Sequence, residues 1–155
     1  MKVIQAQPAH VELVVPLFDQ YRQFYQQPSD MAEARRFLGE RLSQGQSVIF
    51  LALADNGAAV GFTQLYPSFS STSMKRLWIL NDLYVAPEQR NRGVARTLME
   101  RVRQLAVETQ AEGLTLETAT DNWAAQALYE SLGYKRDEAF YRYNLIPAPV
   151  APKKK

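Results

Sequence analysis

A tight-turn signal between two β-rich runs constrains the fold of this chain more than any other local feature. The runs are Ser47–Ala54 and Ala59–Tyr66, and the residues between them include Asn56-Gly57. Asn-Gly readily adopts the left-handed backbone of the turns that join neighbouring strands. The two runs are therefore expected to pair as an antiparallel hairpin.

Apolar periodicity predicts further strands and helices on both sides of this hairpin. Helical spacing begins after Pro8 and resumes after the break at Pro28-Ser29-Asp30, so two helices should precede the hairpin. A nearly continuous apolar run that Pro87 closes is typical of a central strand. The expected strands are 2–7, 47–54, 59–66, 77–85, 114–118, 134–137 and 140–145, and the expected helices are 8–25, 31–42, 93–109 and 122–132, with a serine-rich loop at 67–73.

The order of these elements indicates a mixed architecture. Antiparallel hairpins are combined with one crossover helix between strands that should be parallel neighbours. The fold class is therefore mixed α/β (α+β), with a central, largely antiparallel twisted sheet of about seven strands and four helices. Residues 1–146 are expected to form one domain, and the Pro/Lys-rich stretch 147–155 a flexible tail.

Composition excludes several classes of function. The 155 residues include no cysteine and one histidine, His10, so disulfides, a zinc site and a Ser-His-Asp triad have nothing to be built from. The net charge is +2, and the three terminal lysines alone exceed it, so no nucleic-acid partner is expected. No apolar run suits a signal peptide or a membrane span. We expect a cytoplasmic protein without a metal; a nucleic-acid binder acting through the basic tail is a weaker alternative.

The stretch from Val85 to Ala95 has the features of a phosphate-binding loop. A buried strand ends, a polar loop with Arg90 and Arg92 follows, and a helix opens at Gly93. The first turn of such a helix presents unpaired amides and the positive end of the dipole, and glycine leaves room for a phosphate. By itself the stretch also fits an ordinary turn with solvated arginines.

Two motifs, about 30 residues apart, make the chain similar to a known family. Arg90, Gly93 and Ala95 fit the coenzyme-loop pattern Gln/Arg-x-x-Gly-x-Gly/Ala. The second pattern, Asn-x-x-Ala-x-x-Leu-Tyr-Glu-x-x-Gly-Phe/Tyr, is met by Asn122, Ala125, Leu128, Tyr129, Glu130, Gly133 and Tyr134. With both motifs the chain resembles the GCN5-related N-acetyltransferase (GNAT) superfamily, and most of all its branch of histone and polyamine acetyltransferases.

This resemblance implies an activity and a cofactor. Such enzymes transfer an acetyl group from acetyl-CoA to a primary amine by direct attack in a ternary complex. The amine is expected to be a polyamine or an amino-acid-like molecule first and a protein lysine or N-terminus second, with an aminoglycoside also possible and a homodimer expected. A non-catalytic acetyl-CoA sensor is the alternative. The resemblance places the coenzyme at Leu83, Tyr84, Val85, Arg90, Asn91, Arg92, Gly93, Val94, Ala95, Arg96, Asn122 and Tyr129.

By resemblance Tyr129 is the general acid of the reaction. A thiolate leaves when the tetrahedral intermediate collapses, and a phenol with a pKa of about 10 can protonate a thiolate whose conjugate acid has a pKa of about 8.5. Asn122, seven residues earlier, would share nearly the same helix face and address the same ligand. A packing role under the last strands is the alternative for Tyr129.

Asp82 is the candidate group for the amine substrate, because a carboxylate in a mostly apolar strand needs a reason to be there. The alternative is a strand-end aspartate that meets an arginine. A carboxyl with a pKa near 3.9 is poorly matched to an ammonium near 10.4, which favours positioning over direct proton removal. Related polyamine enzymes carry Glu-Asp where this chain has Asn81-Asp82, so the proton acceptor stays open. The expected substrate-binding residues are Tyr21, Phe24, Tyr25, Tyr66, Asn81 and Asp82.

Overall fold

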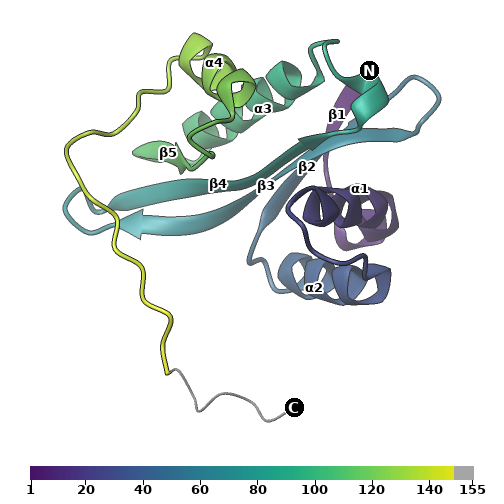
Figure 1. The fold of residues 1–155 in the computed structure, drawn as a ribbon, viewed down its shortest axis with the longest axis horizontal. Helices are drawn as coiled ribbons and strands as arrows, with labels where there is room; N and C mark the ends of the chain where they lie inside the picture. The colour runs from purple at the N-terminus through teal and green to yellow at the C-terminus, as the bar shows by residue number, and fades with distance from the viewer. Residues whose placement is uncertain (149–155) are drawn as a thin grey trace. The chain divides into compact units, whose positions relative to one another are not determined.

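The computed structural model describes residues 1–148, which fall into two units, 1–117 and 118–148, each considered by itself below. Whether 1–146 forms the single expected domain stays a prediction, and most of the predicted tail lies outside the described residues. No helix within 1–148 combines the length and the apolar character needed to cross a bilayer. The elements (Figure 1) are β1 (Lys2–Gln5), η1 (Pro8–His10), α1 (Val11–Phe24), α2 (Met31–Ser43), β2 (Val48–Leu53), β3 (Ala59–Ser70), β4 (Lys75–Val85), η2 (Pro87–Gln89), α3 (Val94–Glu108), β5 (Gly113–Leu116) and α4 (Trp123–Ser131).

The first unit is built on one five-stranded sheet in the order β1-β2-β3-β4-β5. The first three pairings are antiparallel, and β4 pairs with β5 in parallel. Gly57 has a φ of 87° in the turn between β2 and β3, where Ala54 N donates to Ala58 O over 2.8 Å. The predicted hairpin and the mixed, largely antiparallel class are confirmed.

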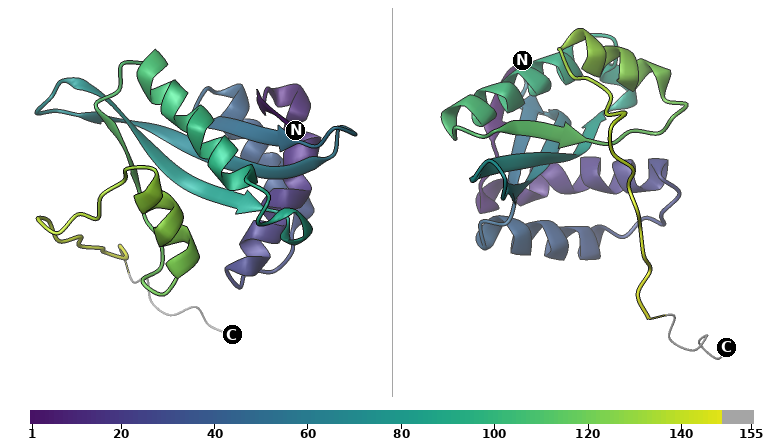
Figure 2. Two further views of the ribbon diagram at one scale, coloured as in Figure 1. Left: turned by 90° about the horizontal axis from the view of Figure 1, so that it is seen from above. Right: turned by 90° about the vertical axis from the view of Figure 1, so that its left-hand side faces the viewer.

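Helices cover both faces of this sheet. α1 and α2 lie on one face and α3 lies on the other (Figure 2). Val14, Leu38 and Ile49 are fully buried in the layer under α1 and α2, and Leu98 and Val102 of α3 are fully buried as well.

A close approach fixes the start of α3 against the sheet. A Cβ on Gly61 of β3 would lie 3.1 Å from both Tyr84 O and Val94 Cγ1, so a larger residue would push the strand and the helix slightly apart. The first turn of α3 is thereby held beside the end of β4, where the coenzyme loop was predicted.

The predicted loop at 67–73 is wrong for residues 67–70, which belong to β3, and only residues 71–74 form the turn between the two strands. β3 extends to Ser70 and β4 begins at Lys75, with Ser70 opposite Lys75. The pairing with β2 ends at Leu65, so Pro67 lies where β3 has become an edge strand and proline leaves no missing ladder bond there. The Arg76 guanidinium also stacks on aromatic rings of both strands.

Buried Asp19 fixes the link between α1 and α2. Its Oδ2 accepts hydrogen bonds from Ser29 Oγ at 2.6 Å and from Gln23 Nε2 at 3.0 Å, and its Oδ1 accepts from Asp30 N at 2.8 Å. Burial alone would raise the pKa of Asp19, but these bonds and the charge of Arg22 lower it below its usual value. The segment after α1 is therefore anchored from within the core.

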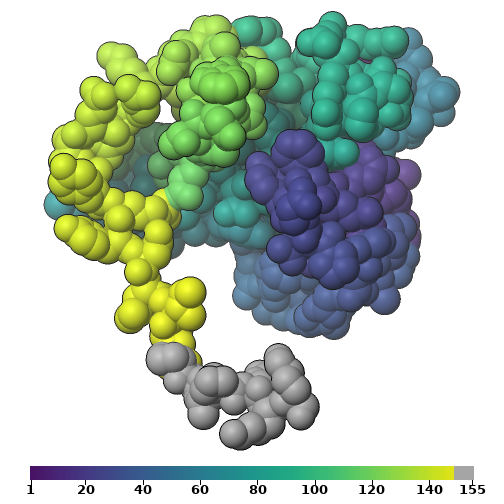
Figure 3. Space-filling model, in the orientation of Figure 1, coloured from purple at the N-terminus to yellow at the C-terminus, as the bar shows by residue number. Residues whose placement is uncertain are grey.

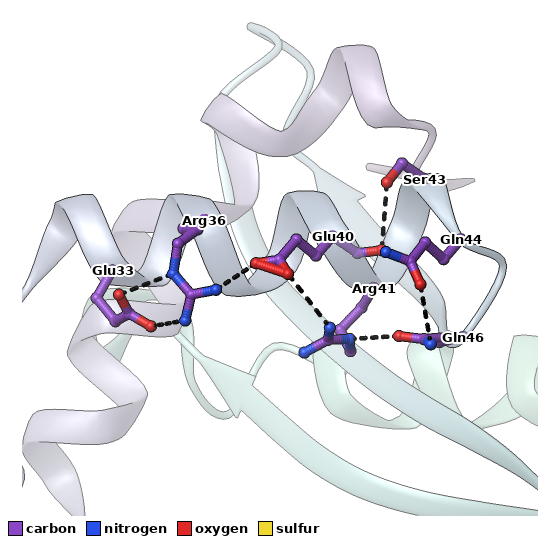
Figure 4. A network of polar contacts seen from close by, with 7 residues as sticks. All are labelled: Glu33, Arg36, Glu40, Arg41, Ser43, Gln44 and Gln46. Carbon is purple, nitrogen blue, oxygen red and sulfur yellow. Dashed lines mark hydrogen bonds and ion pairs between the residues drawn. The ribbon is translucent and has the colours of Figure 1, made fainter.

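The outer side of α2 carries a chain of polar contacts. Arg36 pairs with Glu33 and Glu40, and Arg41 Nε donates to Gln46 Oε1 over 2.7 Å (Figure 4). Exposed ion pairs of this kind add little to stability. Their consequence here is to hold Arg41 in place at the end of α2.

In the second unit, α4 is followed by residues that form no further regular element up to position 148. The predicted strands 134–137 and 140–145 are wrong, because the described residues after Gly133 adopt neither helix nor strand and run as an extended segment (yellow in Figure 3). Phe140 and Tyr143 are 81% and 90% exposed, so their alternation with polar residues buries no face. Residues 1–148 thus hold five strands instead of about seven, while the four expected helices are present.

Candidate active site

The loop between β4 and α3 has the left-handed backbone that the phosphate-loop prediction requires. Asn91 has a φ of 62°, and Gly93, the N-cap residue of α3, has a φ of 81°. Glycine adopts this region without strain, and asparagine does so more easily than most residues. Because the cap is a glycine, no side chain of its own covers the first-turn N–H groups of α3. An anion suits this helix end.

The arginines of this loop differ in where they point. Arg90 turns back onto β4, where its Nε donates to Val85 O over 3.0 Å and its guanidinium lies 5.4 Å from the centre of the Tyr84 ring. Arg92 and Arg96 are exposed. Arg90 thus fixes the loop, and the other two present positive charge on its outside.

The pairing of β4 with β5 stops before the end of β4. The last pair is Leu80 with Leu116, although β4 continues to Val85. Along Leu83–Val85, β3 is the only ladder partner within the described residues. On the side of β5 the backbone of this segment therefore has no neighbouring strand among the described residues.

Asp82 is a buried member of a cluster of polar side chains on β3 and β4, in which Gln64 is also buried and Asn81 is exposed. Gln64 pairs with Asp82 and Leu65 with Leu80, so Asn81 is the extra residue of a β-bulge. Asp82 is 4% exposed; its Oδ2 accepts from Gln64 Nε2 at 2.7 Å and its Oδ1 from Asn81 Nδ2 at 3.0 Å. The bulge thus places two neutral donors on one buried carboxylate.

The carboxylate of Asp82 has no cationic partner in the part of the chain that the structure describes. The alternative of an aspartate that meets an arginine is therefore wrong for these residues. Burial raises the pKa of Asp82, and hydrogen bonds from Gln64, Tyr21 and Asn81 offset only part of that effect. A buried carboxylate held only by neutral donors retains a strong attraction for a cation.

Tyrosines lie close to this carboxylate. Burial, followed by the negative charge of Asp82, raises the pKa of Tyr66 to about 12, while the Arg41 guanidinium acts in the opposite direction. The Tyr21 hydroxyl donates to Asn81 O over 3.4 Å. The structure thus brings together Tyr21, Tyr66, Asn81 and Asp82.

The two remaining predicted substrate residues lie farther out, at the end of α1. Phe24 and Tyr25 are 57% and 51% exposed, and their ring centres are 5.2 Å apart. Tyr25 also meets Tyr21, with ring centres 5.1 Å apart in an edge-on arrangement. Tyr21 therefore links the exposed aromatic pair to the buried carboxylate.

In the second unit, the predicted motif residues lie on and beside α4. Asn122 caps the helix as predicted, with its Oδ1 accepting from Ala125 N at 3.2 Å. Tyr129 is half-buried, and its ring centre lies 6.0 Å from that of Tyr134. Gly133, with a φ of 96°, ends the helix as expected.

Gln64 is the polar residue of the cluster that the sequence analysis missed. The argument that singled out Asp82, a polar side chain in an apolar strand, applies equally to Gln64 within 59–66. Its side chain is fully buried. The register that sets it opposite Asp82 depends on the bulge, which no local pattern predicts.

Comparisons with known proteins establish the family of this chain. The Acetyltransferase (GNAT) family profile matches residues 14–134. The chain is 46% identical over 149 residues to the uncharacterized N-acetyltransferase YhfO of Bacillus subtilis, covering 96% of this chain and 99% of that protein. It is 33% identical over 90 residues to the D-amino-acid N-acetyltransferase HPA3 of Saccharomyces cerevisiae, covering 58% and 56%.

A solved structure is similar to this chain in both sequence and fold. The crystal structure of a probable acetyltransferase is 46% identical and superposes with a TM-score of 0.90, covering 99% of this chain and all of that one. The chain belongs to the GNAT family of acetyltransferases. Within residues 1–148, no group of three or more histidine, aspartate or glutamate side chains is placed to hold a metal ion.

Proposed function

We propose that this protein transfers the acetyl group of acetyl-CoA to the primary amine of a small molecule, by direct attack in a ternary complex. The observation that carries the proposal is the buried carboxylate of Asp82. It accepts hydrogen bonds from neutral donors, and no cationic side chain among residues 1–148 pairs with it. A substrate ammonium would supply the missing charge. The yeast relative is a D-amino-acid N-acetyltransferase, which supports a small amine.

Two parts of the first unit would bind the coenzyme. The first-turn amides of α3, with Arg92 and Arg96, suit a diphosphate. The backbone along Leu83–Val85, beyond the last β4–β5 pair, suits the pantetheine arm, and an amide there would polarise the thioester carbonyl as charge develops on its oxygen. Neither role needs a metal.

The motif residues of the second unit complete the proposal on the strength of the resemblance. Tyr129 would protonate the departing thiolate, and Asn122, with its Oδ1 used as a cap, could offer its Nδ2 to the coenzyme. The homodimer, the cytoplasmic location and the polyamine branch rest on the resemblance as well.

Replacing Asp82 with asparagine is the experiment that tests the role of this carboxylate. The asparagine side chain keeps the shape and removes the charge, so kcat/KM for the amine should fall about 100-fold or more while the affinity for acetyl-CoA is retained. Thiol release with a panel of polyamines, amino acids, aminoglycosides and lysine peptides would measure it.

A matched control is Asp19→Asn, which alters another buried carboxylate of the same unit at the link between α1 and α2. It should lower stability and leave the amine kinetics nearly unchanged. Equal kcat/KM in native protein and Asp82→Asn would refute the role of Asp82. Tight coenzyme binding with no turnover of any amine would favour the non-catalytic sensor.

A further inference from the structure

Gln64 has an unused hydrogen-bonding atom in the most buried part of the cluster. The residue is 0% exposed, and its buried Oε1 has no hydrogen-bond partner among residues 1–148, while its Nε2 donates to Asp82 Oδ2 over 2.7 Å. If the amide were turned by a half-turn while Asp82 is ionised, Gln64 Oε1 would face Asp82 Oδ2, and two acceptors cannot form a hydrogen bond. A buried acceptor left unpaired costs free energy, so this arrangement calls for an explanation.

The explanation lies in the second protonation state of Asp82. A protonated carboxyl donates from its hydroxyl, and the carbonyl end of the Gln64 amide is the acceptor that can receive this bond after a half-turn of the amide. In either orientation one end of the amide bonds to Asp82 and the other end is left over, namely the carbonyl when Asp82 is ionised and the NH₂ group when it is protonated. A residue that hydrogen-bonds both protonation states of Asp82 needs an Oε1 that no other group holds in place.

We propose that Gln64 is a positioning residue that makes Asp82 the proton acceptor of the reaction, by hydrogen-bonding the carboxylate through Nε2 and the carboxylic acid through Oε1. This inference rests on the proposed amine acetylation. Asp82 is 4% exposed, so the proton would reach it at the remaining open edge, directly or through one water.

The protons of the reaction balance with this assignment. The substrate ammonium gives one proton to Asp82, and the neutral nitrogen then attacks the thioester carbonyl to form the C–N bond. As the C–S bond breaks, the proton still in excess on nitrogen is released and the thiolate takes up one proton, from the general acid that the family resemblance assigns. Asp82 finally releases its proton to water, so the products are the amide, the free thiol and one proton.

The groups around Asp82 determine the direction of the pH effects. Tyr21 of α1 and Tyr66 of β3 are the titratable neighbours, and Arg41 of α2 is the charged group that acts on Tyr66. Only ionised Asp82 accepts a proton, so turnover should fall as the pH drops through its pKa. This fall is the acid limb of the pH–rate profile. Without Gln64 the acid limb should move to higher pH, because the bond to the carboxylate is stronger than the bond to the carboxylic acid, and its loss raises the pKa of Asp82.

Gln64→Met tests the positioning role, since methionine fills similar space without a donor or an acceptor. We expect the acid limb to move to higher pH and kcat on the plateau above it to stay close to native, because the carboxylate loses a bond that stabilises its charge and its protonated form is then no harder to reach. An acid limb that stays at its native pH in Gln64→Met would overturn the proposal.

Thr63→Val is the matched control. Thr63 is a fully buried neighbour on the same strand, and its Oγ1 donates over 2.7 Å to the backbone oxygen of Asp82, not to its carboxylate. It should lose stability like Gln64→Met while its acid limb stays in place. A shift as large as that of Gln64→Met would show that a merely structural disturbance suffices, and would count against the proposal.

Nuclear magnetic resonance of the native protein provides a readout that needs neither a variant nor a substrate. Below the titration midpoint of Asp82, the Overhauser contact between the Gln64 side-chain NH₂ protons and the Asp82 Hβ protons should weaken as the amide turns. A contact that persists unchanged through the titration would overturn the inference. Because this result does not depend on turnover, it separates failure of the inference from failure of the proposed function.

Discussion

Replacing Gly93 with valine is expected to weaken the binding of acetyl-CoA by about 100-fold or more, while the protein still folds. A Cβ at Gly93 meets no atom within 4 Å, so the valine side chain would project into the open space where we place the diphosphate. A β-branched residue is also strained at a φ of 81°. Calorimetric titration with acetyl-CoA would measure the loss.

Gly57→Val is the control for backbone strain. Gly57 has a φ of 87° and equally open surroundings, but it lies in the turn between β2 and β3. Both variants should lose similar stability, and only Gly93→Val should lose coenzyme affinity. A native dissociation constant for Gly93→Val would show that the loop is misassigned.

Tyr129→Phe should reduce kcat about 100-fold and leave the affinity for acetyl-CoA nearly unchanged. The substitution removes only the hydroxyl that we assign to protonating the thiolate, and loss of a general acid has effects of this size. Rates of thiol release at saturating amine, with calorimetry for the coenzyme, would separate the two quantities.

Tyr134→Phe provides the comparison, because Tyr134 contacts the Tyr129 ring in the same unit. It should retain most of the activity. Equal losses in the two variants would indicate that the hydroxyls serve packing or stability, and native turnover of Tyr129→Phe would reject the acid role.

Much of the fold could be predicted because its local signals agree with its tertiary structure. Asn56-Gly57 forms the turn that its backbone preferences favour, and Asn122 and Gly133 bound α4 as their capping preferences suggest. The chain at Pro67, where a loop was predicted to begin, is instead strand, because pairing of β3 with β4 overrides the local preference of proline for a loop. Around Phe140 and Tyr143 the alternation of apolar and polar residues predicted a strand that does not form. Alternation alone does not provide a neighbouring strand with which to pair.

The residues of the candidate site were likewise predictable only in part. Gly93 and Asp82 stand out as residue types that are unexpected at their positions, and the structure gives both a physical setting that fits the prediction. Gln64 could not be linked to Asp82 from the sequence, because a one-residue bulge at Asn81 sets the register of β3 and β4. The end of the β4–β5 pairing at Leu80 is likewise a property of the sheet and not of any local pattern.

The central claim is that the loop ahead of α3 holds the diphosphate of acetyl-CoA, and calorimetry with the native protein tests it most directly. Acetyl-CoA should bind with a dissociation constant between about 1 μM and 1 mM, the range usual for enzyme substrates. S-acetylpantetheine, which has the thioester but lacks the diphosphate, should give no saturable heat in the same range. Equal binding of the two compounds, or no heat from acetyl-CoA even at millimolar concentrations, would contradict the account.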